Sequence, residues 1–169
     1  VTDYNYSFTH IVSVNTQDDD EKPVYETLLI GSSSNIYVSQ DNIYIKMPRW
    51  NDHAETTLIN RIEIKGGDIN CMSSGEVPGR LLNQFAMDEP NGFFRLATTV
   101  GHVTRFMDEA TSQNNIYVLD MDLDIVGRLE GLAPVETIYS ARFMGESCYL
   151  VTFKKVDPFF VIDLTDPYE

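Results

Sequence analysis

Short β-prone runs, each closed by turn-forming residues, recur along the chain and are clearest in its last third. Residues 139–143, 148–153 and 159–164 are three such runs, rich in aromatic and β-branched side chains. Glycine, serine, aspartate and proline stand in the gaps between the runs, and these residues favour tight turns. Runs of this length with this punctuation predict an antiparallel meander of three strands.

The same pattern returns upstream at a long and fairly regular spacing. Second strands are predicted to begin at Ile43, Phe93 and Cys148, which are 50 and 55 residues apart. The third strands also echo one another, because residues 118–122 (VLDMD) resemble residues 161–165 (VIDLT). A four-stranded unit that recurs every ~40–50 residues is typical of a β-propeller blade. The sequence therefore predicts an all-β fold.

The repeat predicts that the whole chain, 1–169, is a single β-propeller segment of about three blades, each an antiparallel sheet. It predicts a blade fragment at 4–30, four-stranded blades at 35–76 and 81–130, and a second fragment at 137–167. Each blade buries its faces against neighbouring blades, so a ring needs whole blades. Because the predicted strands do not make a whole number of blades, we expect a segment that is incomplete at both ends.

Local patterns predict several finer features within these blades. Residues 48–55 are expected to form a polar break, and residues 81–87 are expected to form one continuous strand. A single helical turn is predicted at 106–110, inside an irregular insert. Because two cysteines do not make a disulfide framework, Cys71 and Cys148 are expected to be buried or half-buried free thiols.

Composition excludes several classes of function. The net charge of −14, from 26 acidic and 12 basic residues, excludes nonspecific nucleic-acid binding, which needs clustered Lys and Arg. Membrane insertion is not expected, since no apolar run approaches the ~18 residues of a spanning helix. The first residues have neither a basic start nor an apolar core, so this segment carries no signal peptide. A strongly acidic surface favours solubility.

Several stretches together carry a resemblance to a known family. These segments are residues 82–89, 94–99, 115–120, 127–134 and 138–164. They resemble secreted archaeal and bacterial proteins with a C-terminal β-propeller domain that is distantly related to WD repeats. The resemblance implies an extracellular or cell-surface location. It brings no catalytic motif with it, so no catalytic residue is carried over.

Two acidic stretches and three histidines are candidate metal ligands. Residues 18–21 form a block of like charges, and 120–124 has the D-x-D-x-D spacing of calcium loops without the glycine and final glutamate. Both are predicted to be solvated hairpin tips, with a calcium loop as the alternative. His10, His53 and His102 lie far apart, and none has metal-ligand spacing. No metal or cofactor is predicted, and Ca²⁺ is expected to be dispensable.

Four charged residues near the predicted turns and strands are candidates for a catalytic or binding role. Asp88 and Glu89 are adjacent, and neighbours in an extended chain point opposite ways, which is poor geometry for an acid–base pair. Arg95 and Arg142 lie inside predicted inner strands of adjacent blades. They are expected to line the central channel or an interblade contact, or else to form a buried ion pair or pack on aromatics.

The sequence has the repeat pattern of propeller blades but no motif that brings catalytic residues together, and the functional hypothesis follows from this combination. We expect a non-enzymatic interaction domain or surface scaffold whose partner is a protein or a cell-surface component. The alternative is a hydrolase or lyase with an active site at the channel mouth, completed by blades outside this segment. Unpaired strands at the two ends also predict self-association through open sheet edges.

Overall fold

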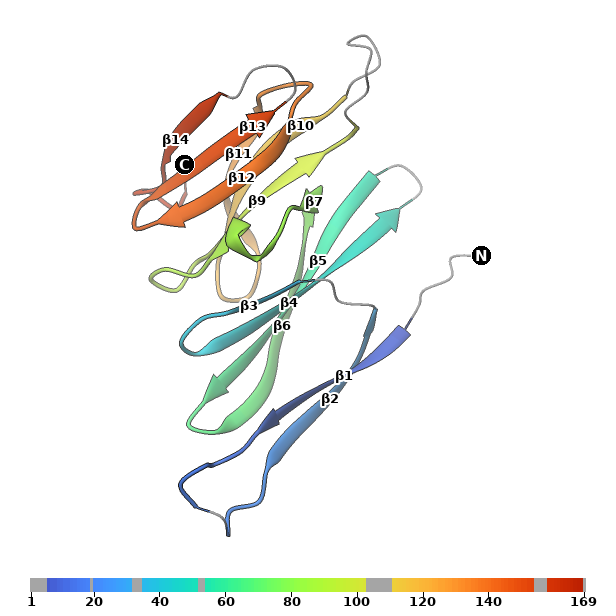
Figure 1. The fold of residues 1–169 in the computed structure, drawn as a ribbon, viewed down its shortest axis with the longest axis vertical. Coiled ribbons are helices and arrows are strands. Elements are labelled where there is room, and N and C mark those ends of the chain that lie inside the picture. Colours follow the sequence, from blue (N-terminus) through green and yellow to red (C-terminus); the bar gives the residue numbers. More distant parts are fainter. Residues whose placement is uncertain are drawn as a thin grey trace.

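Four antiparallel sheets follow one another in chain order and stack one above the next in the computed structural model (Figure 1). The all-β, antiparallel prediction is confirmed. The structure describes residues 6–18, 20–31, 35–51, 54–102, 111–153 and 158–168. The predicted helical turn at 106–110 and His53 lie outside the described residues. Nothing in the described ranges forms a helix that is long and apolar enough to cross a membrane.

The first sheet is a hairpin and the second is a meander. The hairpin consists of β1 (Tyr6–Ser13) and β2 (Val24–Gly31). The second sheet has the strand order β3-β4-β5-β6, with bounds β3 (Asn35–Val38), β4 (Asn42–Asn51), β5 (Ala54–Lys65) and β6 (Asp68–Pro78).

The third and fourth sheets repeat the meander. The third sheet has the order β11-β10-β9-β7, and β8 also pairs with β9. Its bounds are β7 (Arg80–Leu81), the 3₁₀ turn η1 (Gln84–Ala86), β8 (Met87–Asp88), β9 (Phe94–Val100), β10 (Gln113–Leu119) and β11 (Ile125–Leu132). The fourth sheet is β12 (Thr137–Met144), β13 (Ser147–Phe153) and β14 (Phe159–Asp163).

The prediction of a polar break at 48–55 is wrong. Strand β4 continues through Pro48, which pairs with Thr57, and β5 already begins at Ala54. Within the described residues, pairing with β3 ends at Lys46, whereas β4 keeps pairing with β5 as far as Asn51. Pairing with one neighbour is thus enough to continue the strand through Pro48.

The prediction of a continuous strand at 81–87 is also wrong. The first strand of the third sheet is split into β7 and β8, and the 3₁₀ turn η1 lies between them. The side-chain oxygen of Asn83 accepts a hydrogen bond from the backbone N–H of Phe85 at 2.9 Å. Asparagine side chains offer the backbone such local partners in competition with a strand ladder. The break leaves the ring of Phe85 projecting from the turn.

The thiol prediction holds for one cysteine and fails for the other. Cys148 is completely buried on β13, whereas Cys71 is exposed on β6. Strand β6 is the outermost strand of its sheet, and the pairing shifts register between Arg61 and Ile62, which leaves Met72 as an extra residue. A side chain on a bulged edge strand has fewer neighbours to cover it.

The main core lies between the second, third and fourth sheets. At its centre the ring of Tyr44 stacks on that of Phe94, with centroids 3.9 Å apart and an angle of 9° between the rings. Both side chains are fully buried, and they come from different sheets. A smaller cluster of Ile45, Ile62 and Ile69 packs under Leu28 and Ile30 of the first sheet. Apolar burial therefore joins each sheet to the next.

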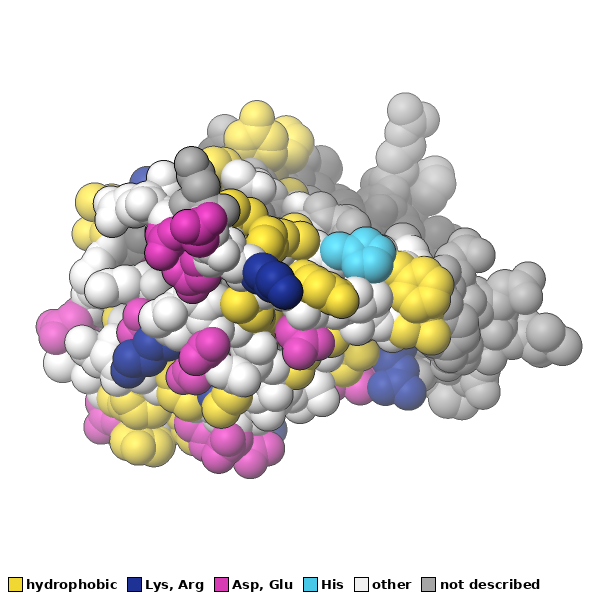
Figure 2. Space-filling model, turned by 90° about the horizontal axis from the view of Figure 1, so that it is seen from below, with side chains coloured by type: hydrophobic (Ala, Val, Ile, Leu, Met, Phe, Trp, Pro, Cys, Tyr) yellow, Lys and Arg dark blue, Asp and Glu magenta, His cyan; other side chains and the backbone are white. Residues whose placement is uncertain are grey.

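The opposite face of the first sheet is exposed and largely apolar. The apolar pairs Phe8–Leu29 and Val12–Tyr25 lie on it with the polar pair His10–Thr27 between them, and all of these side chains are exposed. Figure 2 views the molecule from this end and shows hydrophobic side chains at the surface among acidic and basic ones. A sheet face of this kind is suited to cover by another layer.

Glycines on the outer strands allow two close contacts between sheets. A Cβ added to Gly75 on β6 would stand 2.6 Å from the Cβ of Leu123, closer than real Cβ atoms approach. Leu123 lies in the turn after β10 and is buried, with a left-handed φ of 66°. Gly127 on β11 likewise faces the backbone of Pro167, which follows β14. In both contacts the turn after a third strand docks on the outer strand of the preceding sheet.

An aspartate shapes each of these docking turns. Oδ1 of Asp120 accepts hydrogen bonds from the backbone N–H groups of Asp122 and Asp124, both at 3.0 Å. Oδ1 of Asp163 accepts from the backbone N–H of Thr165 at 3.0 Å. Aspartate is favoured in turns because its side chain mimics a backbone acceptor in this way. The echo between 118–122 and 161–165 thus marks a repeated docking turn.

Candidate functional site

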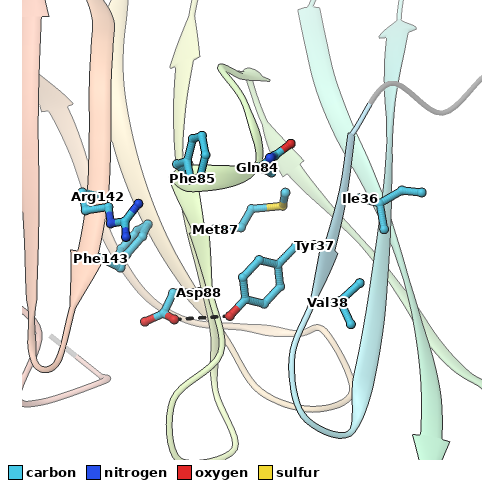
Figure 3. Close-up of a pocket in the computed structure, with 9 residues that line it drawn as sticks. All are labelled: Ile36, Tyr37, Val38, Gln84, Phe85, Met87, Asp88, Arg142 and Phe143. Carbon is cyan, nitrogen blue, oxygen red and sulfur yellow. Dashed lines mark hydrogen bonds between the residues drawn. The ribbon is translucent and has the colours of Figure 1, made fainter.

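A cavity of about 360 Å³ opens where the first strands of three successive sheets meet. We call it the inner-strand cavity. Figure 3 shows its lining, which comes from β3, η1, β8 and β12. The lining residues are Ile36, Tyr37, Val38, Gln84, Phe85, Met87, Asp88, Arg142 and Phe143.

Asp88 connects the three sheets at the floor of this cavity. One carboxylate oxygen accepts a hydrogen bond from the hydroxyl of Tyr37 at 3.4 Å, and the other pairs with the guanidinium of Arg95. Arg95 also donates to the carbonyl oxygen of Gly145 at 2.8 Å and lies over the ring of Phe143, 5.4 Å from its centroid. Burial and the nearby Asp88 carboxylate raise the pKa of Tyr37. Arg95 therefore forms an interblade contact that includes an ion pair.

Arg95 is only 4% exposed, so this contact is structural. A buried guanidinium without a carboxylate carries a large desolvation cost. Asp88 supplies that carboxylate, and the Phe143 face adds a favourable cation–π contact. The carboxylate of Asp88 is thereby committed to holding the sheets together.

Glu89 points to other partners than Asp88 does. Both of its carboxylate oxygens accept from the side-chain amide of Asn42 at 3.2 Å. Oδ1 of Asn42 in turn accepts from Arg61 at 3.0 Å. The two adjacent carboxylates thus do not converge on one substrate atom, and each is bound to the framework.

The most accessible apolar side chain of the cavity is Phe85, which is 54% exposed. Ile36 and Val38 are also exposed, but they alternate with Tyr37 and lie on the face of β3 that is turned to the first sheet. The guanidinium of Arg142 lies over the Phe85 ring, 5.6 Å from the centroid. Within the described part of the chain, no Asp or Glu forms an ion pair with Arg142. The cavity therefore offers apolar surface and one available cation.

In the two acidic stretches that are candidate calcium loops, side-chain oxygens accept hydrogen bonds from neighbouring residues of the same turn. Oδ1 of Asp18 accepts from the N–H of Asp20 at 3.0 Å, and Glu21 accepts from the side-chain amide of Asn15 at 2.6 Å. Asp120 caps its own turn, as described above. Across the described ranges, no three His, Cys, Asp or Glu side chains are grouped to hold a metal ion.

The two described histidines lie outside the inner-strand cavity. His10 is on β1, and its Nδ1 is 2.9 Å from the hydroxyl oxygen of Thr27. His102 is exposed in the loop after β9. Neither residue contributes to the cavity lining.

Asp88 and Arg142 stand out in the sequence as candidate residues, whereas Phe85 does not. A signal was present in the repeat. Tyr37, Met87 and Arg142 are separated by 50 and 55 residues, the same spacing as the second strands. Equivalent positions in successive blades lie at the same level of a propeller, so this spacing brings them to one place.

Comparisons with known proteins were made over the whole chain. The family model for the β-propeller domain matches residues 1–169. An uncharacterised protein of Methanocaldococcus jannaschii is 51% identical over 113 residues, which are 67% of this chain and 17% of that protein. An uncharacterised protein of Archaeoglobus fulgidus is 47% identical over 91 residues, 54% of this chain and 13% of that protein. The matched segments thus span less than a fifth of either relative.

Among solved structures, a subtype N10 neuraminidase-like protein of a little yellow-shouldered bat isolate superposes with a TM-score of 0.47 at 13% identity. The superposition covers 82% of this chain and 45% of that one. The family match extends over every sheet described above, and its archaeal relatives are uncharacterised. This chain belongs to the β-propeller domain family.

Proposed function

We propose that this chain is a non-catalytic binding domain that engages a protein or another cell-surface component through the inner-strand cavity. The observation that carries the proposal is the exposed Phe85 ring beside the Arg142 guanidinium, in one concave site shared by three sheets. An exposed aromatic side chain favours contact with a partner, since covering it removes it from water.

The state of the nearby carboxylates supports binding over catalysis. General acid–base work needs a carboxyl group that is free to exchange a proton with a bound substrate. Asp88 is held by Arg95 and Tyr37, and Glu89 is held by Asn42. Withdrawing either carboxylate would leave a buried partner unsatisfied, which costs about 1–3 kcal/mol or more for a charged group.

A location outside the cell is part of the same proposal. It is supported by the resemblance to exported proteins and is compatible with the strongly acidic composition, a net charge of −14. The test is protease treatment of intact cells that make the native full-length protein. Digestion of this domain without lysis supports the location, and protection until lysis contradicts it.

Selection from a displayed peptide library tests the binding role. Peptides are selected on the wild-type chain and counter-selected on Phe85→Asp, which places a charge on the exposed ring position. The affinity of enriched peptides should fall about tenfold or more in this variant, because burying one aromatic side chain contributes about 1.5–3 kcal/mol.

Phe153→Asp is the matched control, since Phe153 is also an exposed aromatic but does not line the cavity. Its affinity for the same peptides should equal that of the wild type. Enrichment that is insensitive to Phe85, or turnover of a glycan or phosphoester by the purified full-length protein, would contradict the proposal.

A further inference from the structure

We infer that Arg142 and Phe85 form a binding site for the carboxylate of a ligand whose apolar part lies against Tyr37 and Met87. The inference rests on the proposed binding function and assigns its ligand class. It follows from the geometry of one arginine and from the charges around it.

The guanidinium carbon of Arg142 lies over the ring of Phe85, 5.6 Å from its centroid, and the two residues come from different sheets. A guanidinium carries five N–H donors, and a cation–π contact uses none of them as a hydrogen bond. Arg142 can therefore donate two parallel hydrogen bonds to a carboxylate.

Arg142 is the arginine of the cavity lining, and it forms no ion pair within the described ranges. Arg61 and Arg128 share that property, whereas Arg49, Arg80 and Arg95 pair with Glu76, Glu55 and Asp88. No such carboxylate reaches Arg142 within the described ranges, although acidic residues outnumber basic ones by 26 to 12. The charge of Arg142 is thus available to an external anion.

The carboxylate of Asp88 is the nearest opposing charge in the cavity lining. Its pairing with the buried Arg95 offsets the repulsion that it would exert on an incoming anion. The remaining oxygen accepts from the hydroxyl of Tyr37. An anionic group bound at Arg142 is therefore repelled little by Asp88, because the charge of Asp88 is paired with that of Arg95.

The other side of the cavity provides the apolar half of the site. Figure 3 shows Tyr37 on the strand opposite Arg142, pointing toward Met87 and Asp88, whereas Ile36 and Val38 point away from Arg142. At about 360 Å³ the cavity falls in the size range of small-molecule sites. A short apolar moiety that ends in a carboxylate spans it, such as an apolar residue at a peptide C-terminus or a small organic acid.

Matched probes test this chemistry on the ¹⁵N-labelled chain by NMR titration. The probes are 3-phenylpropionate, its neutral amide 3-phenylpropanamide, and 2-phenylethyl phosphate. The carboxylate should bind about tenfold more tightly than the amide, with shifts at the amides of Phe85 and Arg142. Binding of the carboxylate should also weaken as salt is added.

Variants separate the charge from the fold. Arg142→Gln should reduce carboxylate binding to the level of the amide. Arg49→Gln should leave it unchanged, because Arg49 is an exposed arginine that does not line the cavity. Equal binding of acid and amide in the cavity would overturn the inference while leaving the binding role intact.

Three other outcomes would also overturn the inference. They are tighter binding of the phosphate than of the carboxylate, shifts confined to residues outside the cavity, and no binding of any probe. The peptide selection described above judges the binding role separately, so the two can fail independently.

Discussion

Replacing Gly75 with alanine should destabilise the protein by forcing two sheets apart. The added Cβ would lie 2.6 Å from the Cβ of Leu123, whereas ordinary contacts begin at 3.4 Å, so the two must separate by about 0.8 Å. Overpacking of a core contact costs about 1–3 kcal/mol. The lower entropy of the unfolded alanine chain offsets about 0.4–1 kcal/mol of that. We expect a net loss of about 1–2 kcal/mol.

Thermal unfolding followed by circular dichroism measures this effect. A loss of about 1–2 kcal/mol lowers the Tm by about 2–8 °C in a domain of this size. Ser74→Ala is the control, because Ser74 is an exposed neighbour on the same strand. Hydrogen exchange should quicken at Leu123 and Asp124 in the Gly75 variant, since their turn loses its docking site. Equal Tm values for the two variants would refute the close contact.

Three further outcomes follow from burial and charge. At about pH 8 a thiol reagent should react with Cys71 only, because Cys148 is buried and its pKa is raised to about 12; two fast equivalents would contradict this. Burial raises the pKa values of Tyr44 and Tyr117, so the folded state keeps protons that the unfolded chain loses, and stability should fall as pH rises above about 10. Complete tyrosine titration without unfolding would refute that. Raising salt from ~0.05 M to ~1 M should promote association by screening the charge of −14, and light scattering that shows a monomer at both would contradict it.

Strand positions could be predicted from the sequence because their cause is local. Alternating β-branched and aromatic residues between turn formers predict both the strand and its ends, as in 148–153. The predictions for residues 48–55 and for Cys71 failed because a neighbouring strand, and not the local sequence, determines the structure there. Pro48 breaks a strand in general, but here β4 continues through it because it pairs with the long strand β5. Cys71 lies in a β-prone run, but its strand is outermost and bulged.

The cavity could be predicted only in part for a related reason. Arg142 and Asp88 attract attention as charged residues in a β-rich region, whereas an exposed Phe85 looks like one more core aromatic in the sequence. Its exposure depends on the Asn83 cap that splits the strand. The depth of the cavity depends on how far apart the sheets lie, and no single strand determines that distance.

Close contacts on the side of the repeat away from the cavity also contribute to the distance between sheets. The cavity lies at the first strands, whereas Gly75 and Gly127 lie on the last strands of their sheets. Each glycine lets the backbone of the following sheet approach closely, and Asp120 and Asp163 hold the approaching turns in shape. A sheet that is fixed at its outer edge and packed through its core can present its first strand at only one angle. The placement of Arg142 against Phe85 therefore depends on small residues at the opposite edge, although they contact neither side chain.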